Sequence, residues 1–299
     1  MKHDTPSATA ALVLKALLFA AHDRAHARLV STEAARWSRL MALKILRWPR
    51  LFLFAARSPL CRWLFQTAER MLNPGFILHV AARKAFIDRL ARTAIDAGAA
   101  QLIVVGAGYD TLALRIAASY PRVRCYEIDH PTTQEAKRGA LAAAAVPVNW
   151  WLVPADLSVR SFAEVSAELP RFDAGDNTLV VMEGVLMYLP AAVVAKFFTE
   201  LAARFRGGVT CIFTFMERGA GGDIQFKTAH PWVNWWLQRK RERFLWGIER
   251  TRIADFLADS GFINAVTYGK AEFAHVLFAD DPPRLAEGEL IGMAAAPLS

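Results

Sequence analysis

Acidic residues and two closely spaced glycines recur in this chain, each just after a short apolar run. Gly106 and Gly108 follow "LIVV", Asp129 ends "CYEID", Asp156 ends "WLVPAD" and Glu183 follows "TLVVM". Glycine lets the backbone turn tightly and approach a ligand closely, and carboxylates accept hydrogen bonds from hydroxyl and amino groups. Such a set is suited to a ligand that carries sugar hydroxyls and an amino-substituted ring.

The spacing within this set narrows the ligand. Asp129 follows Gly108 at close to the roughly 20-residue offset at which an acid meets the hydroxyls of a ribose. The dinucleotide fingerprint needs a third glycine where this chain has Thr111, and Asp110 would repel a pyrophosphate. No phosphate-binding G-x-x-x-x-G-K-[ST] motif is present. The pattern therefore predicts an adenosine cofactor without phosphates, S-adenosylmethionine, and argues against an NAD-dependent oxidoreductase.

The other acids have more than one interpretation. Asp156 could accept from the amine of an adenine, with the Leu157 N–H directed at a ring nitrogen, or it could cap a helix. Asp129 could instead cap the helix that starts at "HPTTQEAKR", and Glu127, on the same strand face, could compete for the ribose. Glu183 ends an apolar strand, where burying an unpaired carboxylate would be costly.

These residues need a scaffold that brings strand ends together. Short β-branched runs alternate with helical stretches, which indicates an α/β fold with a doubly wound, mostly parallel sheet. In such sheets ligands bind at the carboxyl ends of the strands. Strands are expected at 102–105, 122–128, 149–153, 178–182 and 209–215, with helices at 111–119, 131–145, 158–169 and 191–206.

Three further segments complete the expected organisation. Residues 8–97 show helical periodicity broken at Pro49, Pro59 and Pro74, which predicts an N-terminal helical cap over 1–97 and a cofactor-binding core over 98–299. An insertion at 216–250 is expected to form a lid whose Trp232, Trp235 and Trp236 supply an apolar acceptor pocket. Two late runs, 263–268 and 273–279, are expected to pair as an antiparallel hairpin through Gly269 and Lys270.

Composition limits the class of protein and its partners. Hydrophobic residues make up 54% and charged residues 21%, which suits a globular core. Cys61, Cys125 and Cys211 are far apart, so neither a disulfide framework nor a metal site is expected, and a cytoplasmic location is the simplest. The net charge of +8 comes from residues 1–70. The basic N-terminal helices could contact a membrane, whereas no nucleic-acid-binding motif is present.

The segments "GAGYDTLALR", "YEIDHPTTQEAKR", "PADL" and "EGVLMYLP", in this order, resemble the leucine carboxyl methyltransferase family. The resemblance extends over about residues 75–265 and implies the class I methyltransferase fold with S-adenosylmethionine as cofactor. It also implies that Arg83 binds the methionine carboxylate of the cofactor and that Gly106 lines the cofactor's path. The same resemblance assigns the ribose to Asp129, the adenine to Asp156 and Leu157, the methionine end to Glu183 and a place near the methyl acceptor to Tyr188.

Two departures from the family pattern leave the acceptor open. Many relatives carry Arg where this chain has Leu112, and those that act on a protein phosphatase carry Arg where it has Ser158. A small-molecule carboxylate is favoured because it needs no base. Arg115, or Arg239, Arg241 or Arg243 of the insertion, could hold it in place of the missing arginine. The alternatives are a hydroxyl of a natural product, for which His130 or His230 could be the base, and a basic binding module without catalytic activity.

Overall fold

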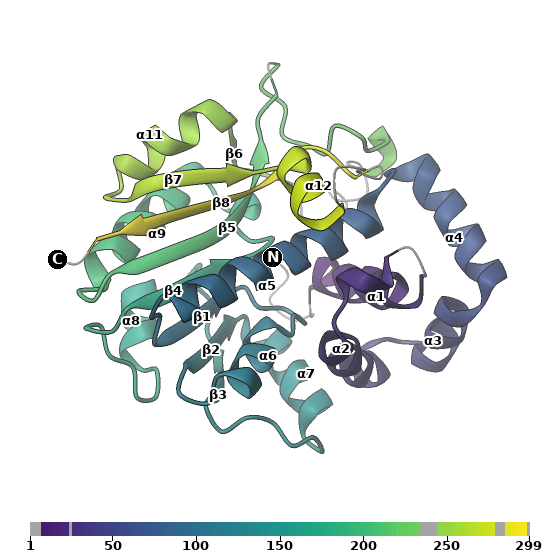
Figure 1. The fold of residues 1–299 in the computed structure, drawn as a ribbon, viewed down its shortest axis with the longest axis horizontal. Helices are drawn as coiled ribbons and strands as arrows, with labels where there is room; N and C mark the ends of the chain where they lie inside the picture. The colour runs from purple at the N-terminus through teal and green to yellow at the C-terminus, as the bar shows by residue number, and fades with distance from the viewer. Residues whose placement is uncertain (1–6, 24–25, 220, 234–243, 279–284, 298–299) are drawn as a thin grey trace.

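The computed structural model describes residues 7–23, 26–219, 221–233, 244–278 and 285–297. Its centre is an eight-stranded sheet in the order β3-β2-β1-β4-β5-β8-β7, with β6 paired to the end of β5 (Figure 1). All neighbours pair in parallel except that β8 runs antiparallel to β5 and β7. The strands are β1 (Gln101–Val105), β2 (Arg124–Asp129), β3 (Trp150–Pro154), β4 (Thr178–Met182), β5 (Val209–Glu217), β6 (Gly247–Ile248), β7 (Ile263–Tyr268) and β8 (Glu289–Ala296).

Helices cover both faces of this sheet. One face is covered by α5 (Phe76–Asp96), α6 (Leu112–Ser119), α7 (Pro131–Leu141) and α12 (Lys270–Phe278), and the other by α8 (Phe162–Ala167), α9 (Ala191–Arg204) and α11 (Ile253–Ala258). The described residues also form the 3-10 helices η1 (Ala27–Leu29), η2 (Leu186–Tyr188) and η3 (Arg250–Arg252). The doubly wound α/β fold is therefore confirmed.

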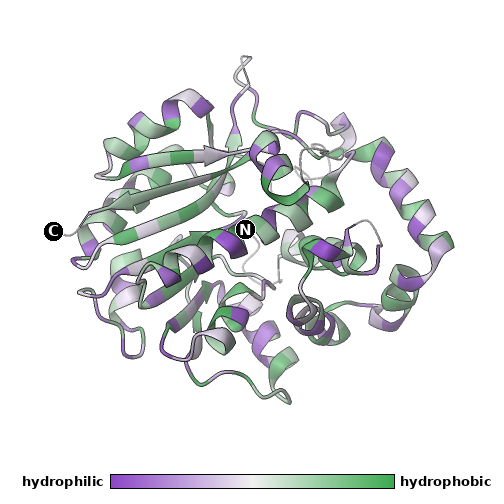
Figure 2. Ribbon diagram, in the orientation of Figure 1, coloured by the Kyte–Doolittle hydropathy of each residue, from purple (hydrophilic) through white to green (hydrophobic). Residues whose placement is uncertain are grey.

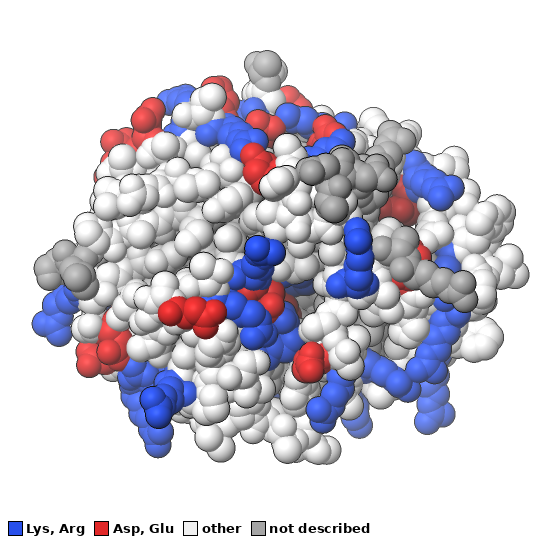
Figure 3. Space-filling view, viewed as in Figure 1, with Lys and Arg blue, Asp and Glu red and all other residues white. Residues whose placement is uncertain are grey.

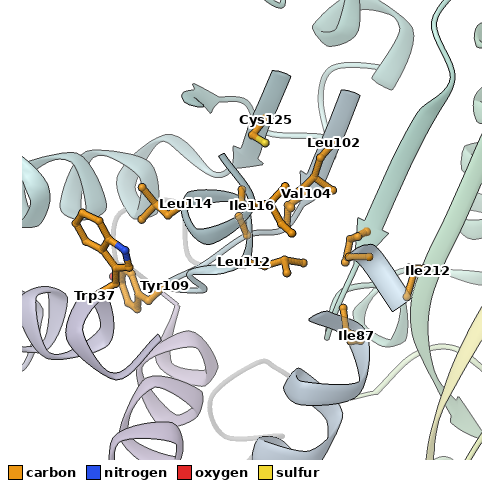
Figure 4. Packing of buried hydrophobic residues seen from close by; sticks show 14 of the residues in the cluster. Trp37, Ile87, Leu102, Val104, Tyr109, Leu112, Leu114, Ile116, Cys125 and Ile212 are labelled. Atoms are coloured by element: carbon orange, nitrogen blue, oxygen red, sulfur yellow. The ribbon is translucent and has the colours of Figure 1, made fainter. Parts of the chain in front are cut away.

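The core follows the period of two along β1. Leu102 and Val104 pack with α6 on one face, as Figure 4 shows, while Ile103 and Val105 pack with α8 and α9 on the other. Every residue of β1 is buried, as expected of a central strand that is covered by helices on both sides. A strand held this firmly fixes where the Gly106 turn begins.

The N-terminal part is helical, as the sequence predicts: α1 (Ala8–His22), α2 (Thr32–Ile45), α3 (Pro49–Arg57) and α4 (Pro59–Leu72) precede α5. Pro49 and Pro59 occupy the first turns of α3 and α4, where a missing N–H costs nothing. Trp37 of α2 lies against Tyr109 of the glycine turn (Figure 4). The cap thus packs directly on the end of the sheet where a ligand is expected, while the division at residue 97 stays a prediction.

The predicted hairpin between 263–268 and 273–279 is wrong. Residues 270–278 form α12, and the antiparallel partner of β7 is β8. Glu272 accepts a hydrogen bond from the Gly269 N–H at 2.7 Å and so caps the first turn of the helix. The apolar run 273–278 then packs Phe273 against Phe86 of α5, at 5.0 Å between ring centroids. An apolar run of this length fits a buried helix as well as a strand, and the cap favours the helix.

Candidate functional site

A cavity of about 330 Å³ opens at the carboxyl ends of β1 and β4. The glycine turn and Asp129 line one part of the cavity, α5 lines another part through Arg83 and Lys84, which we call the floor, and α1 also contributes to the lining. Of the eight residues predicted to take part, six line it: Arg83, Gly106, Gly108, Asp129, Glu183 and Tyr188.

The glycine turn can only be built from glycine at its first position. Gly106 has a φ of +65°, and a Cβ there would lie 2.2 Å from a methyl group of Val185. Gly108 has a φ of +50°, and its Cβ would lie 3.2 Å from the Cβ of Ala10 in α1. Both conformations disfavour other residues, and the contact with Val185 additionally excludes a side chain at 106. The turn therefore exposes backbone to the cavity.

Asp129 is held in place by the backbone of this turn. Its Oδ2 accepts from the Gly108 N–H at 2.5 Å, and its Oδ1 accepts from its neighbour's N–H, that of His130, at 2.6 Å. Burial raises the pKa of Asp129, and the two N–H donors act against that rise. Each carboxylate oxygen accepts more than one hydrogen bond, so Asp129 can still bind a pair of hydroxyl groups.

The floor of the cavity is a buried ionic network. The Arg83 guanidinium lies 2.7 Å from Glu183 and 2.5 Å from Glu289, and the ammonium of Lys84 lies 3.1 Å from Glu183 and 3.2 Å from Asp110. These five residues come from α5, the glycine turn, the end of β4 and the start of β8. Burying any one of them alone would be costly, so they stabilise each other only as a set.

The cations keep two of these acids ionised. Burial acts to raise the pKa of Glu289, but the Arg83 guanidinium and a hydrogen bond from His79 outweigh it and lower that pKa to about 2. Burial likewise opposes ionisation of Asp110, while the positive charges of Lys84 and Arg115 lower its pKa to about 2. Glu289 and Asp110 are therefore both ionised at neutral pH.

The charges that line the cavity do not cancel. Among the described residues, four carboxylates face two cations, because Asp129 has no cationic partner in the wall of the cavity. In addition, the Oε1 atom of Glu289 is buried without a hydrogen-bond partner in the described structure, while its Oε2 bonds Nε2 of His79 at 2.9 Å. A buried carboxylate oxygen without a partner is available to a ligand that donates hydrogen bonds. The cavity is suited to a ligand with net positive charge.

Asp156 and Leu157 lie beside the cavity and not in its wall. Asp156 follows β3, which pairs with β2, and its Oδ2 lies 3.7 Å from Nε2 of His130, the residue after Asp129. Its Oδ1 accepts from the N–H and the hydroxyl of Ser158 at 2.9 and 2.6 Å. The predicted helix cap is therefore wrong, because Ser161 is the N-cap of α8 and Asp156 instead stabilises the turn after β3. The role of Asp156 at the adenine stays a prediction.

Two other candidate residues, Glu127 and Arg115, form ion pairs outside the cavity wall. Glu127 is buried against the ammonium of Lys137 and accepts from the Trp150 indole at 2.9 Å, so it does not compete for the role of Asp129. Arg115 pairs with Asp88 and does not reach the cavity wall, so the suggestion that it holds the acceptor is wrong. Its side chain stabilises the contact of α6 with α5 instead.

The histidines proposed as bases also lie outside the cavity wall. The Nδ1 atom of His130 lies 2.9 Å from the hydroxyl of Thr132 at the start of α7, where the ring caps the helix. The N–H of His230 donates to the Leu72 carbonyl at 2.7 Å and ties the inserted segment to the end of α4. Both positions serve the local fold.

The inserted segment supplies an apolar wall through Phe226, Phe244 and Leu245, whereas only one of the three predicted tryptophans is described. Trp232 is 62% exposed and does not line the cavity, while Trp235, Trp236 and the nearby Arg239, Arg241 and Arg243 lie outside the described residues. Tyr188 contacts Phe244 of this segment with tilted rings, at 5.6 Å between ring centroids. The apolar lining comprises Val13, Leu14, Leu17, Phe76, Met187, Tyr188, Leu189, Phe226, Phe244 and Leu245.

Sequence reasoning missed three contributors to the site. Lys84 follows Arg83 directly but belongs to no recognised pattern, and Glu289 lies at the start of a strand far along the chain. The apolar face of α1 reaches the cavity because α1 packs across α5. One sequence signal for Lys84 was available. Asp110 lies in the glycine turn, and a buried carboxylate there requires a cation nearby.

Comparison with known proteins also indicates a methyltransferase. A model of the leucine carboxyl methyltransferase family matches residues 15–202, which includes most of the N-terminal helices. A relative from Mycolicibacterium paratuberculosis is 30% identical over 154 residues, 48% of each chain, and one from Mycobacterium marinum is 26% identical over 222 residues, 73% of this chain and 71% of that one. Both are named as candidate S-adenosyl-L-methionine-dependent methyltransferases. The chain thus spans about half the length of the first relative.

A solved structure shares the fold over nearly the whole chain. A candidate methyltransferase from Thermobifida fusca is 18% identical, with a TM-score of 0.54 over 90% of this chain and 96% of its own length. At this identity the likeness concerns the arrangement of strands and helices alone.

Proposed function

The chain belongs to the leucine carboxyl methyltransferase family of S-adenosylmethionine-dependent methyltransferases, and we propose that it methylates an oxygen atom of a small, apolar acceptor, most readily a carboxylate. The observation that carries the proposal is the charge of the cavity. S-adenosylmethionine has a sulfonium and an ammonium group against one carboxylate, so its net positive charge matches a wall with four carboxylates and two cations.

The proposed roles of the cofactor-binding residues follow from their places around the cavity. Asp129 would accept from the ribose hydroxyls, since both its oxygens are already oriented by backbone N–H groups. Asp156 and Leu157 would meet the adenine beyond the cavity wall. Arg83 would bind the carboxylate of the methionine moiety, and Glu183 its ammonium group.

The bound cofactor would supply an activated methyl group, and the chain must then place the acceptor in line with it. Positioning alone lowers the barrier of such a displacement substantially. The apolar wall, which includes Phe226, Phe244 and Met187, favours an acceptor with a hydrophobic body. Tyr188 stands at this wall and could donate a hydrogen bond to an acceptor oxygen.

A carboxylate is favoured over a hydroxyl because of the proton. A carboxyl group is ionised at neutral pH and brings its own nucleophilic oxygen, whereas a hydroxyl needs a base within reach. Tyr109, a residue of the glycine turn, is a poor base because burial and the negative charge of Asp129 raise its pKa to about 12. The three separate cysteines point to a cytoplasmic location for this reaction.

The test combines binding and product analysis on the purified chain. Calorimetry should detect binding of S-adenosylmethionine, and a screen of carboxylic acids and phenols with labelled cofactor should yield a labelled product. Methyl esters release volatile methanol in mild base and methyl ethers do not, so the product identifies the acceptor class. Label found only on nitrogen or carbon would contradict oxygen methylation.

A further inference from the structure

The most unusual surface of the molecule lies on α3 and α4, at the edge farthest from the sheet (Figure 1). We call the exposed side of residues 43–72 the outer arm. It exposes large apolar side chains to between 40% and 73% of their full area. These are Leu43, Trp48, Leu51, Phe54, Leu60, Trp63, Leu64, Phe65, Met71 and Leu72. A concentration of exposed large apolar side chains on one part of a protein marks an interaction site.

Helix α4 is amphipathic with its apolar stripe facing outwards. Leu60, Trp63, Leu64 and Met71 recur at the spacing of one helical face, and all four are more than half exposed. In the described structure, α4 has no buried residue at all. A helix that served only to cover the domain would turn this stripe inwards.

Polar side chains on the opposite face of α4 hold it in this orientation. Arg62 donates to the carbonyl of Arg57 at 2.7 Å, Gln66 donates to Asp23 at 2.9 Å, and Glu69 accepts from the N–H of Ile77 at 3.1 Å. These hydrogen bonds attach the polar face of α4 to neighbouring parts of the chain. The outward direction of the apolar stripe is therefore built into the fold.

Helix α3 continues the same surface with cations beside the apolar residues. Leu51 and Phe54 are exposed, whereas Leu53 and Ala56 on the opposite face are buried. Arg50 and Arg57 flank the exposed pair in the chain, and both are exposed. Figure 2 shows hydrophobic and hydrophilic residues alternating along the two helices that Figure 1 labels α3 and α4. Apolar side chains flanked by arginines are typical of helices that lie in the interface of a membrane.

The charge of the outer arm has one sign. Its exposed cations are Lys44, Arg47, Arg50, Arg57 and Arg70. The single acid between residues 43 and 72 is Glu69, which is directed inwards. Figure 3 shows white surface bordered by blue along the edge where Figure 1 places α3 and α4.

We propose that the outer arm binds the surface of an anionic lipid bilayer, with Leu60, Trp63 and Leu64 inserted among the acyl chains and the arginines at the phosphate groups. Tryptophan and arginine are the side chains suited to this boundary. No helix in the described ranges is long and apolar enough to cross a membrane, so the arm would lie on the surface.

A second copy of the chain fits this surface less well. A two-fold symmetric contact would place the arm against itself, because such interfaces use the same patch on both subunits. The cations of one arm would then meet those of the other, and the arm carries no outward acid to pair with them. Lipid phosphates supply the missing negative charges.

The arm is connected to the wall of the cavity. The Leu72 carbonyl at the end of α4 accepts from the His230 N–H at 2.7 Å, and Asn73 accepts from the Thr228 hydroxyl at 3.2 Å. Two residues before Thr228, Phe226 lines the cavity. Membrane contact would therefore bring the apolar cavity close to the lipid phase, although the membrane proposal itself does not depend on the chemistry of the reaction.

The test is co-sedimentation of the full chain with vesicles, which needs no substrate. One set consists of phosphatidylcholine alone and the other of phosphatidylcholine and phosphatidylglycerol in equal amounts. We expect binding to the second set, falling with added salt. The triple variant Leu60→Ser, Trp63→Ser, Leu64→Ser should bind at least about tenfold more weakly. The double variant Arg50→Gln, Arg57→Gln should lose about fivefold per cation.

Matched variants on other surfaces serve as controls. Val148→Ser combined with Val159→Ser removes two residues that are 94% and 78% exposed, and Arg122→Gln combined with Arg206→Gln removes the same charge as the arginine pair. Both controls should bind vesicles like the unaltered chain.

Three results would overturn the proposal. The first is that the unaltered chain binds neither vesicle set, and the second is that the folded triple variant binds as tightly as the unaltered chain. The third is that light scattering shows a dimer, which the triple variant converts to monomer, without any vesicle binding. The last result would assign the arm to a second copy.

Discussion

The floor of the cavity and the outer arm both depart from the usual distribution of side chains, in opposite ways. The floor buries charged residues, and the arm exposes large apolar ones. In the floor, each charge has a partner within the chain, as Arg83 does in Glu183 and Glu289. In the arm, the four side chains of the apolar stripe of α4 are more than half exposed, and α4 has no fully buried residue in the described structure. Buried charges that are paired within the chain can form a site for a small ligand. Exposed apolar side chains that the chain itself does not cover can instead bind an external surface.

Removing Arg83 should break the compensation in the floor. In Arg83→Met, Glu183 loses its guanidinium partner and Glu289 keeps only its bond to His79, so unfolding free energy should fall by roughly 3–5 kcal/mol. Urea titration measures the loss. Lys270→Met, which breaks the exposed pair with Glu287 at 2.8 Å, should cost less than about 1 kcal/mol. Equal effects of the two variants would mean that the floor is not a coupled network.

Adding Glu289→Gln to Arg83→Met should recover part of the lost stability, because it removes one of the uncompensated charges. Residues in one ionic network show such non-additive effects. Strict additivity of the two single losses would contradict direct coupling between Arg83 and Glu289.

The floor should also make stability depend on acid pH. The pKa of Glu289 is about 2 in the folded chain against an ordinary value of 4.5. A lowered pKa contributes stability above pH 4.5, and this contribution is lost as the pH falls towards 2. The loss should be on the order of 3 kcal/mol. Glu289→Gln should flatten the fall between pH 4.5 and 2, measured by thermal unfolding, and an unchanged slope would assign the fall to other groups.

Replacing Asp129 should weaken cofactor binding, with a smaller effect than the changes in the floor of the cavity. In Asp129→Ala, the ribose hydroxyls would lack a charged acceptor, a loss of roughly 1.5–3 kcal/mol in the affinity for S-adenosylmethionine. Calorimetry should show about tenfold to hundredfold weaker binding. Asp255→Ala, at an exposed position of α11, is the control and should bind normally. Unchanged affinity in a folded Asp129→Ala would remove this assignment.

Sequence reasoning reached the strands because β-branched runs bounded by turns identify them. It also reached the acids Asp129 and Glu183, since the carboxyl ends of parallel strands meet at one edge. It could not identify Glu289 as a site residue. The place of Glu289 in the sheet depends on the register between β5 and β8, which are far apart in the chain. Helix α12 was mistaken for a strand because a short apolar run fits either element until its cap is known.

The direction of the stripe on α4 was beyond reach for a related reason. Periodicity shows that Leu60, Trp63 and Leu64 share a face, but it does not show whether protein or solvent covers that face. The answer lies in the opposite face, where Gln66 and Glu69 bond to Asp23 and Ile77. These partners lie before and after the helix in the chain, and only the fold brings them together.

The smallest expected effect is the change in stability when the apolar stripe of α4 is removed. The triple variant Leu60→Ser, Trp63→Ser, Leu64→Ser should change the unfolding free energy by no more than about 0.5 kcal/mol per site, since these side chains gain little from folding. Leu53→Ala, on the buried face of the adjacent helix and 7% exposed, should cost about 2–5 kcal/mol. Urea titration of both variants in the absence of lipid makes the comparison. If the triple variant lost as much stability as Leu53→Ala, the stripe would already be covered within the chain, and no external surface would be needed to explain it.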